Sequence, residues 1–436
     1  MSMPHYKVTS HSEPVSGAVS MPGSKSYTNR YLLLSALCDG ESVLRNASLS
    51  DDSAKMIEIL SSLGVKIDVE SELVHVTGLG PAFAPYKGVF NVGPAGTCFR
   101  FMTAMLAALP GMDVLLQGSA RMNRRPVQDL ATAINKLGGD IEYVMTDAHP
   151  PLQIIGKQLE REEVTLPGEI SSQFLSALLM IGPLIDGGLA INVEGEQVSK
   201  SYVDMTIDCM QRYGVAVARE GYSRFEVVSD ARYCAREVQV EGDASGASYF
   251  WAIAALTGGT VRVQNVSASS MQGDVEFPNL LDRMGCTVQS GEQAGVPWIE
   301  VTGAAESLSS ISADMSSMPD TAQTLAVVAA CANGPTVLTG LSTLKDKETD
   351  RLKALEVELT KLGIGVTATE DSIAIEGGAP SAGRISTYSD HRMAMSFAAL
   401  ATAVPGIEIE NPQVVSKSFP DFWEQLAGLG VAVEEI

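Results

Sequence analysis

The sequence predicts an α/β protein made of two similar domains with three repeats each. Two observations support this fold class. One order of segments, helix, strand, helix and hairpin, recurs six times along the chain. The length of 436 residues also exceeds what one hydrophobic core usually organises. Three repeats a domain divide the chain near residue 242. We therefore expect an N-terminal domain at 21–242 and a C-terminal domain of 1–20 with 243–436, with hinge crossings near 20–24 and 240–243.

The first helix of each repeat is rich in Ala, Leu and Ser, and a Gly-containing turn and a strand follow it. The small side chains suggest that these helices are buried against close neighbours. The expected helices are Tyr27–Leu37, Thr97–Leu109, Gln173–Ile185, Ser248–Leu256, Thr321–Cys331 and Met393–Ala403. The strands that follow them are Ser42–Leu44, Asp113–Leu116, Leu189–Val193, Thr260–Val263, Thr336–Leu338 and Ile407–Ile409.

The second helix of each repeat ends at a glycine. Glycine in that place supplies the left-handed residue that stops a helix. The alternating residues that follow it are typical of strands. The six glycines are Gly64, Gly138, Gly214, Gly285, Gly363 and Gly430.

The two ends of the chain complement each other. A first strand is expected at about Tyr6 to Ser20, ahead of the first repeat. The last repeat shows only one strand after its final glycine. Residues 1–20 are therefore expected to complete the C-terminal domain.

Composition excludes several classes of function. The formal net charge of −22 argues against a nucleic-acid partner, because nucleic-acid binders usually carry a basic stripe. No apolar run is long enough for a membrane helix, and the N-terminus lacks a signal-peptide pattern. The six cysteines are scattered, which favours reduced thiols and a cytoplasmic location. His391 has no second His or Cys at metal-ligand spacing, so we expect no metal site.

The helix starts carry recurring hydroxyls and cations. Helix N-termini attract anions, and equivalent ends of repeats share a face, so we expect an inter-domain cleft for a ligand with several negative charges. The first helices begin at Ser24-Lys25-Ser26, Gly96-Thr97, Ser171-Ser172-Gln173, Asp243-Ala244-Ser245, Pro319-Asp320 and Asp390-His391-Arg392. The second helices begin at Asp51-Asp52, Arg125-Pro126, Ser199-Lys200, Gly273-Asp274, Lys347-Glu348 and Lys417.

Each of these segments also has an ordinary structural interpretation. The Lys25 segment fits a capped helix with solvated basic residues, and it lacks the glycine spacing of a Walker P-loop. Arg125-Pro126 fits a helix start with proline at its first position. Asp320 fits a simple N-cap, and the charges from Lys347 to Arg351 fit a solvated helix face. Recurrence at equivalent positions favours the binding interpretation.

Together, these short sequence motifs resemble those of the 5-enolpyruvylshikimate-3-phosphate synthase family. They occur in the same order and cover essentially the whole chain. This resemblance implies a fold of two domains, each with three βαβαββ units around a pseudo-threefold, an inside-out α/β barrel. It also implies transfer of the enolpyruvyl group of phosphoenolpyruvate to the 5-hydroxyl of shikimate 3-phosphate, with release of phosphate. The strings are Pro22-Gly23-Ser24-Lys25-Ser26, Asn29-Arg30, Gly96-Thr97, Arg125-Pro126, Ser171-Ser172-Gln173, Val198-Ser199-Lys200, Gly242-Asp243-Ala244-Ser245, Pro319-Asp320, Lys347-Glu348-Thr349-Asp350-Arg351, Asp390-His391-Arg392-Met393-Ala394 and Lys417-Ser418-Phe419-Pro420.

The resemblance also assigns residues to the two substrates. Shikimate 3-phosphate would contact Lys25, Ser26, Arg30, Ser171, Ser172, Gln173, Ser199, Asp320, Thr343 and Lys347. Phosphoenolpyruvate would contact Lys25, Gly96, Arg125, Gln173, Arg351, Arg392 and Lys417. The reaction needs one base for the hydroxyl and one acid for the methylene carbon. We expect Asp320 as the base and Glu348, with a raised pKa, as the acid, with Lys25 assisting at the bridging oxygen.

Several positions depart from the family pattern, and Tyr27-Thr28 replaces smaller residues. Pro94 stands where Asn is common, Phe101 where Pro is usual, and Thr343 where Asn is frequent. Pro94 lacks both an amide N–H and a side-chain amide next to Gly96, so the phosphoenolpyruvate pocket is expected to be reshaped. The predicted consequence is an altered response to glyphosate-like mimics.

Other functions stay open at this point. UDP-N-acetylglucosamine enolpyruvyl transferase shares the fold but has a cysteine on a mobile loop, and 111–125 contains none here. A nucleic-acid-phosphate-processing protein of related repeat fold and a catalytically silent scaffold are further alternatives. We expect a monomer without cofactor, metal or membrane partner, open when empty and closed by its anionic substrates.

Overall fold

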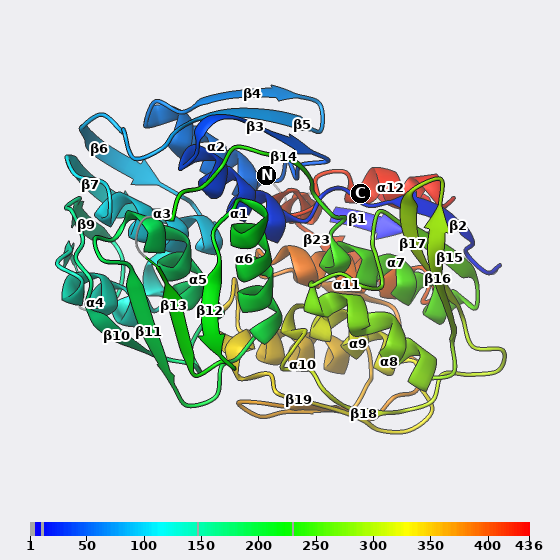
Figure 1. The fold of residues 1–436 in the computed structure, drawn as a ribbon. Helices are drawn as coiled ribbons and strands as arrows, with labels where there is room; N and C mark the ends of the chain where they lie inside the picture. The colour runs from blue at the N-terminus through cyan, green and yellow to red at the C-terminus, as the bar shows by residue number, and fades with distance from the viewer. Residues whose placement is uncertain (1–4, 10–12, 146–147, 229–230) are drawn as a thin grey trace. The chain divides into compact units, whose positions relative to one another are not determined.

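The computed structural model describes residues 5–9, 13–145, 148–228 and 231–436. The chain forms two compact units, which are considered one at a time. Unit 1 comprises Met1–Pro22 and Glu241–Ile436, and unit 2 comprises Gly23–Val240 (Figure 1).

Among its described residues, unit 2 contains three sheets of four strands with one shared topology. In each sheet the second strand runs parallel to the first and antiparallel to the third, and the fourth closes a hairpin with the third. The orders are β14-β3-β5-β4, β6-β7-β9-β8 and β10-β11-β13-β12. The bounds are β3 Asp39–Arg45, β4 Lys66–Glu70, β5 Leu73–Leu79, β6 Tyr86–Asn91, β7 Met112–Gln117, β8 Asp140–Tyr143, β9 Leu152–Ile155, β10 Glu163–Pro167, β11 Leu189–Glu194, β12 Val217–Glu220, β13 Arg224–Val227 and β14 Glu237–Gln239.

Unit 1 repeats these strand directions in its described part, but in its third sheet β1 from the N-terminal segment pairs with β24 where the other sheets have a hairpin. The orders are β2-β15-β17-β16, β18-β19-β21-β20 and β22-β23-β1-β24. The bounds are β1 His5–Val8, β2 Gly17–Ser20, β15 Thr260–Gln264, β16 Thr287–Gln293, β17 Val296–Thr302, β18 Ser312–Asp314, β19 Thr336–Thr339, β20 Val366–Ala368, β21 Ile373–Ile375, β22 Gly383–Ile385, β23 Ile407–Glu410 and β24 Val433–Glu435.

The N-terminal segment forms two strands, so the expectation of one strand from Tyr6 to Ser20 is wrong. β1 lies between β23 and β24, with Tyr6 opposite Ile409 on one side and Glu435 on the other. β2 instead joins another sheet, parallel to β15. Residues 10–12, which fall inside the expected strand, lie outside the described residues. The two short strands thus complete two different sheets of unit 1.

The first helix of each repeat is buried on nearly every side, as its small apolar side chains predict. The second helices expose one face. The first helices are α1 Lys25–Ala36, α3 Gly96–Ala107, α5 Ser172–Ile181, α7 Ala244–Thr257, α9 Ala322–Ala329 and α11 His391–Ala401. The second helices are α2 Asp51–Ser62, α4 Gln128–Lys136, α6 Lys200–Arg212, α8 Phe277–Arg283, α10 Arg351–Lys361 and α12 Phe422–Gly428.

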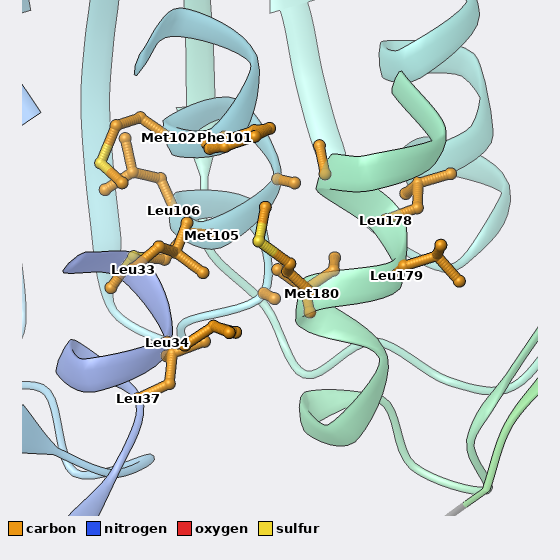
Figure 2. Packing of buried hydrophobic residues seen from close by; sticks show 14 of the residues in the cluster. Leu33, Leu34, Leu37, Phe101, Met102, Met105, Leu106, Leu178, Leu179 and Met180 are labelled. Carbon is orange, nitrogen blue, oxygen red and sulfur yellow. The ribbon is translucent and has the colours of Figure 1, made fainter. Parts of the chain in front are cut away.

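The core of each unit is made by these first helices. In unit 2, Leu33 of α1, Met105 of α3 and Met180 of α5 belong to one buried cluster (Figure 2). In unit 1, α7, α9 and α11 pack against one another (Figure 1). The sheets turn alternate side chains toward the helices, as in β7, where burial alternates along the strand. The helices therefore lie inside and the sheets outside within each unit.

The six glycines predicted to stop the second helices all have a left-handed backbone, which confirms the repeat unit. Their φ angles lie between 84° and 102°. A residue with a Cβ adopts this conformation only at a cost, which explains glycine at all six places. The glycines are Gly64, Gly138, Gly214, Gly285, Gly363 and Gly430.

Several predicted helix starts are wrong by a few residues. α8 and α9 begin at Phe277 and Ala322, after 3₁₀ turns that contain Asp274 and Asp320. α4 begins at Gln128, after Arg125-Pro126. α10 begins at Arg351, because the Asp350 carboxylate caps it by accepting the Lys353 N–H at 3.1 Å. Lys417 ends a 3₁₀ helix, Pro412–Lys417, and α12 begins only at Phe422, since the residue before Pro420 is disfavoured in a helix.

Candidate active site

Arg351 is the centre of an ion-pair network in unit 1. Its side chain is 1% exposed and lies at the start of α10. Nε donates to Asp390 at 2.8 Å, Nη1 to Asp320 at 3.0 Å and Nη2 to Glu348 at 3.0 Å. Burial alone would lower the pKa of Arg351, but the charges of these carboxylates outweigh it and raise the pKa above its ordinary value. The guanidinium therefore stays charged in a dry environment.

Arg392 enters the same network from α11. Its Nη2 donates to Asp320 Oδ2 at 3.0 Å and its Nη1 to the Tyr249 hydroxyl at 3.4 Å. Burial raises the pKa of Tyr249 to about 12, with Arg392 acting in the opposite direction. Asp390 caps α11 by accepting the Arg392 N–H at 2.9 Å. One buried carboxylate therefore fixes the helix start and holds Arg351.

Two lysines complete the network. Lys347 Nζ lies 3.4 Å from Asp320 Oδ1, and Lys417 Nζ lies 2.9 Å from Glu348 Oε1. The network thus joins the cations Lys347, Arg351, Arg392 and Lys417 to the carboxylates Asp320, Glu348 and Asp390. In these ion pairs four cations meet three carboxylates. Unit 1 therefore holds a polar group suited to an anionic ligand.

Asp320 is not the N-cap of α9, contrary to the ordinary structural interpretation. It lies in a 3₁₀ helix, Pro319–Thr321, and the N-cap position of α9 is Thr321. The 3₁₀ turn directs its carboxylate toward Lys347, Arg351 and Arg392 instead of toward the helix N–H groups. Asp320 is therefore available for chemistry rather than for capping.

Asp274 is a further carboxylate of unit 1 that the sequence reasoning did not assign to the site. It is 4% exposed, its Oδ2 bonds the Ser245 hydroxyl, and its Oδ1 has no hydrogen-bond partner among the described residues. Burial raises its pKa to about 7, and the nearby charge of Asp320 adds to the shift. The only sequence signal for it was a helix start near Gly273.

Unit 2 presents a buried arginine next to the start of α3. Arg125 is 8% exposed, and its Nε has no hydrogen-bond partner among the described residues. A Cβ added to Gly96 would lie 2.4 Å from Arg125 Nη1 and 2.8 Å from Arg100 Nη1. Arg100 itself is bonded to Gly96 O at 3.1 Å and to Pro126 O at 3.2 Å. Glycine at position 96 therefore lets the Arg125 guanidinium approach the helix N-terminus.

The starts of α5 and α3 are linked by a side-chain hydrogen bond. Gln173 Nε2 donates to Thr97 Oγ1 at 3.4 Å, and Gln173 Oε1 is buried without a partner in the described structure. Ser171 caps α5 by accepting the Gln173 N–H at 3.3 Å. Ser172, 5% exposed, follows it. Two hydroxyls and an amide thus gather at one helix N-terminus.

Lys25 lies in the first turn of α1 and pairs with a buried carboxylate, since its Nζ is 3.1 Å from Asp52 Oδ2. Ser24 occupies the N-cap position, but its side chain makes no capping bond and its Oγ has no partner among the described residues. Ser26 is half-buried, and its carbonyl accepts from Arg30. The expected position of the helix start is confirmed, and the expected side-chain cap is absent.

Arg30 is held by unit 2 itself. Its guanidinium donates to Thr206 Oγ1 at 2.7 Å, to Ser176 Oγ at 3.3 Å and to the carbonyls of Ser26 and Tyr202. Burial lowers its pKa from the ordinary value, yet an arginine remains protonated in proteins. The Phe101 ring lies 5.4 Å from the guanidinium carbon. Arg30 is therefore a fixed cation, with an aromatic ring where proline is usual in the family pattern.

Two further predicted residues lie at element boundaries. Ser199, 8% exposed, precedes α6 in a left-handed conformation with φ of 52°. Thr343 lies in a 3₁₀ helix, Ser342–Asp346, directly before Lys347, and its buried Oγ1 has no partner among the described residues. Both positions fit hydroxyl contacts with a ligand.

A cavity of about 440 Å³ lies over the sheet of β3, β4 and β5, where Glu41, Asp68 and Glu70 line it, so it does not suit an anion. The described residues contain no group of three or more His, Cys, Asp and Glu placed to hold a metal ion. None of the described helices has both the length and the apolar character needed to span a bilayer.

Comparison with known proteins identifies the family. The family model described as EPSP synthase (3-phosphoshikimate 1-carboxyvinyltransferase) matches residues 9–426. The chain belongs to the EPSP synthase family. The 3-phosphoshikimate 1-carboxyvinyltransferase of Ralstonia pickettii is 43% identical over 424 residues, which cover 95% of this chain and 96% of that protein. The protein of the same name from Burkholderia lata is 41% identical over 428 residues, covering 96% of this chain and 97% of that protein.

Solved structures agree with this assignment. EPSP synthase from Acinetobacter baumannii superimposes with a TM-score of 0.83 at 27% identity, covering 99% of this chain and all of that one. The fold class predicted from the repeats is thereby confirmed. The relatives carry the name of a transferase, and this member of the EPSP synthase family is an enzyme of that class.

Proposed function

We propose that this enzyme transfers the enolpyruvyl group of phosphoenolpyruvate to the 5-hydroxyl of shikimate 3-phosphate and releases phosphate. The observation that carries the proposal is the match to 3-phosphoshikimate 1-carboxyvinyltransferases along nearly the whole chain. The charges of the candidate site support it, because both substrates carry a phosphate and a carboxylate that cations and amides must neutralise. We further propose that the enzyme acts as a monomer.

The residues proposed for binding come from both halves of the sequence. Arginine suits a planar carboxylate through two parallel N–H bonds, and lysine suits a phosphate as a point charge. For phosphoenolpyruvate we propose Lys25, Gly96, Arg125, Gln173, Arg351, Arg392 and Lys417. For shikimate 3-phosphate we propose Lys25, Ser26, Arg30, Ser171, Ser172, Gln173, Ser199, Asp320, Thr343 and Lys347.

Substrate binding would exchange partners within the network of unit 1. In the structure, Arg351 and Arg392 both donate to Asp320. An incoming carboxylate offers these arginines a stronger bidentate partner, so Asp320 loses part of its stabilisation as an anion. A carboxylate released in this way is a better proton acceptor. The substrate thereby prepares the base that acts on it.

The same exchange would prepare Glu348 as the acid. Its carboxylate lies 2.9 Å from Lys417 Nζ and 3.0 Å from Arg351 Nη2, and these two cations favour its charged form. When these cations turn to phosphoenolpyruvate, protonation of Glu348 becomes easier. The raised pKa that the reaction requires is therefore a property of the loaded site.

The proposed reaction is an addition followed by an elimination. The 5-hydroxyl gives its proton to Asp320 while its oxygen bonds C2 of phosphoenolpyruvate, and Glu348 protonates C3. The product is a tetrahedral ketal. Glu348 then takes a proton back from the new methyl group, the double bond re-forms, and the C2–O bond to phosphate breaks. Lys25 assists at the bridging oxygen of the departing phosphate, and this phosphate takes up the proton that Asp320 had accepted, so both carboxyl groups return to their starting states.

The test is phosphate release from phosphoenolpyruvate with one acceptor at a time. We expect release with shikimate 3-phosphate, together with a product heavier by one enolpyruvyl group in mass spectrometry. UDP-N-acetylglucosamine is the alternative acceptor, and a single-stranded RNA with a terminal phosphate tests the nucleic-acid alternative. Release with either of these and none with shikimate 3-phosphate would overturn the proposal. Light scattering of the purified protein decides the oligomeric state.

A further inference from the structure

The turn that leads into α11 has a strained backbone. Tyr388 and Ser389 have φ angles of 54° and 55°. A residue other than glycine adopts this conformation only at a cost in free energy, and the conformation persists only where the surroundings enforce it. The next residue is Asp390, which holds Arg351 and caps the helix that carries Arg392. The strain therefore lies directly beside the proposed substrate-binding arginines.

A buried carboxylate holds this turn. Glu358, on α10, is fully buried. Its Oε1 accepts the Tyr388 hydroxyl at 2.5 Å, and its Oε2 accepts the Ser386 N–H at 3.3 Å. Lys361 Nζ lies 2.8 Å from each oxygen and balances the charge. Burial and the bond to Glu358 raise the pKa of Tyr388, so its hydroxyl remains a donor.

We propose that Glu358 is a positioning residue, which clamps the turn 386–389 so that Asp390 and Arg392 hold their side chains ready for the anionic substrate. Glu358 acts through Asp390 and does not itself touch substrate. The kinetic effect of this clamp rests on the proposed function. Its effect on the backbone of unit 1 does not.

The chain of contacts predicts which kinetic constant responds. Asp390 accepts Arg351 Nε at 2.8 Å, and both Arg351 and Arg392 donate to Asp320. A loosened turn would shift Asp390 and therefore both guanidiniums. These groups are proposed to bind phosphoenolpyruvate, so the KM for phosphoenolpyruvate should rise more than kcat falls.

The experiment compares Glu358→Gln and Tyr388→Phe with a control on the same helix. Glu358→Gln should raise the KM for phosphoenolpyruvate about tenfold and Tyr388→Phe about threefold, with kcat and the KM for shikimate 3-phosphate changed by less than about twofold. The control is Glu356→Gln, because Glu356 Oε1 accepts the Ala368 N–H at 3.1 Å and does not contact the turn. Its constants should equal those of the parent.

A rescue separates positioning from general loss of structure. Ser389→Gly removes the penalty for a left-handed residue, so the turn no longer depends on the clamp. In the Glu358→Gln background, Ser389→Gly should bring the KM for phosphoenolpyruvate most of the way back to the value of the parent. A folded Glu358→Gln protein with unchanged KM, or a double variant that is no better than Glu358→Gln, overturns the proposal.

Hydrogen exchange tests the clamp without activity. Amides of the segment 386–392 should exchange at least tenfold faster in Glu358→Gln than in the parent or in Glu356→Gln, and Ser389→Gly should slow them again. If the parent fails to release phosphate with shikimate 3-phosphate, the proposed function fails while this measurement still decides the role of Glu358. Equal exchange in all variants would refute the clamp.

Discussion

Arg351 and Arg125 both have buried guanidiniums, but their surroundings predict that replacing Arg351 destabilises the protein much more than replacing Arg125. Arg351 holds three carboxylates, and Asp390 among them is fully buried. Arg351→Gln should therefore lower the free energy of unfolding by about 3–5 kcal/mol, because it leaves buried charge uncompensated. Arg125 has an unpartnered Nε, so Arg125→Gln should change stability by less than about 1 kcal/mol.

Kinetics and urea denaturation of both variants check this pair. Arg125→Gln should raise the KM for phosphoenolpyruvate at least about tenfold in a protein of normal stability. Loss of stability in Arg125→Gln equal to that in Arg351→Gln would contradict the distinction drawn between them.

Asp274 predicts a pH dependence of stability in unit 1. Its pKa is about 7 in the folded protein against 3.8 ordinarily, chiefly because it is buried. The folded state therefore binds more protons between these values, and stability falls as pH rises from about 4 to 7. Asp274→Asn removes this loss, so the variant should gain about 1–3 kcal/mol relative to the parent at pH 8 and much less at pH 4.

Urea denaturation at both pH values measures the gain. Asp282→Asn is the matched control, since Asp282 is exposed on α8. The free energy of unfolding of Asp282→Asn should differ from that of the parent by the same small amount at both pH values. A gain for Asp274→Asn that does not depend on pH would show that the carboxyl is not protonated in the fold.

At the scale of single residues, the sequence predicted types and order better than partners. Lys25, Arg125 and Asp320 stand in strings specific enough to be named in advance. The pairing of Arg351 with Asp390 spans 39 residues and that of Glu358 with Tyr388 spans 30. Such pairs depend on how α10 meets the start of α11, and no local pattern encodes that. Arg30 was recognised by its string, but its four internal acceptors were not.

At the scale of elements, the N-terminus of α3 shows how a helix start serves the site. Gly96→Ala would place a Cβ 2.4 Å from Arg125 Nη1. The flexible end of the arginine can move more easily than the helix, so the guanidinium should be displaced. We expect a folded protein whose KM for phosphoenolpyruvate is raised about tenfold or more.

The control for Gly96→Ala is Gly428→Ala in α12, where an added Cβ meets no atom within 4 Å. That variant should keep all kinetic constants and gain up to about 1 kcal/mol of stability. Unchanged KM in Gly96→Ala would mean that Arg125 adopts another position in the working enzyme.

Helices were predicted well at their ends and less well at their starts. A helix ends here at a glycine whose left-handed backbone only that residue adopts cheaply, so sequence and structure agree six times. Starts are ambiguous because polar residues also open 3₁₀ turns. The turns at Pro319–Thr321 and Pro412–Lys417 made Asp320 and Lys417 resemble helix starts.

At the scale of the whole molecule, the pairing of strands that lie far apart in the sequence determines which fragments can fold. β14, at the end of unit 2, completes the sheet of β3, so 23–240 contains all of its own strands. Unit 1 needs β1 and β2 from the N-terminus. The repeats predicted this assignment of residues 1–20, but not that the segment forms two strands, because short strands in different sheets carry no joint periodicity.

We expect 23–240 to fold alone with a cooperative urea transition, and 241–436 to fail. Joining residues 1–22 to 241–436 through a short Gly-Ser linker should restore folding, since Pro22 O already accepts the Asp243 N–H at 3.0 Å. Circular dichroism and dispersed amide NMR spectra would report each fragment. A cooperative transition in 241–436 alone would contradict the role given to β1 and β2.

The network around Arg351 has a consequence for discrimination among the anions of a cell. Because Asp320, Glu348 and Asp390 already neutralise most of its cations, chloride, bicarbonate or a stray nucleotide meets little unbalanced charge there. An anion that binds there gains only the difference between its own interaction free energy with the cations and that of the three carboxylates it displaces. The three carboxylates therefore exclude anions that interact with the cations weakly or with poor geometry.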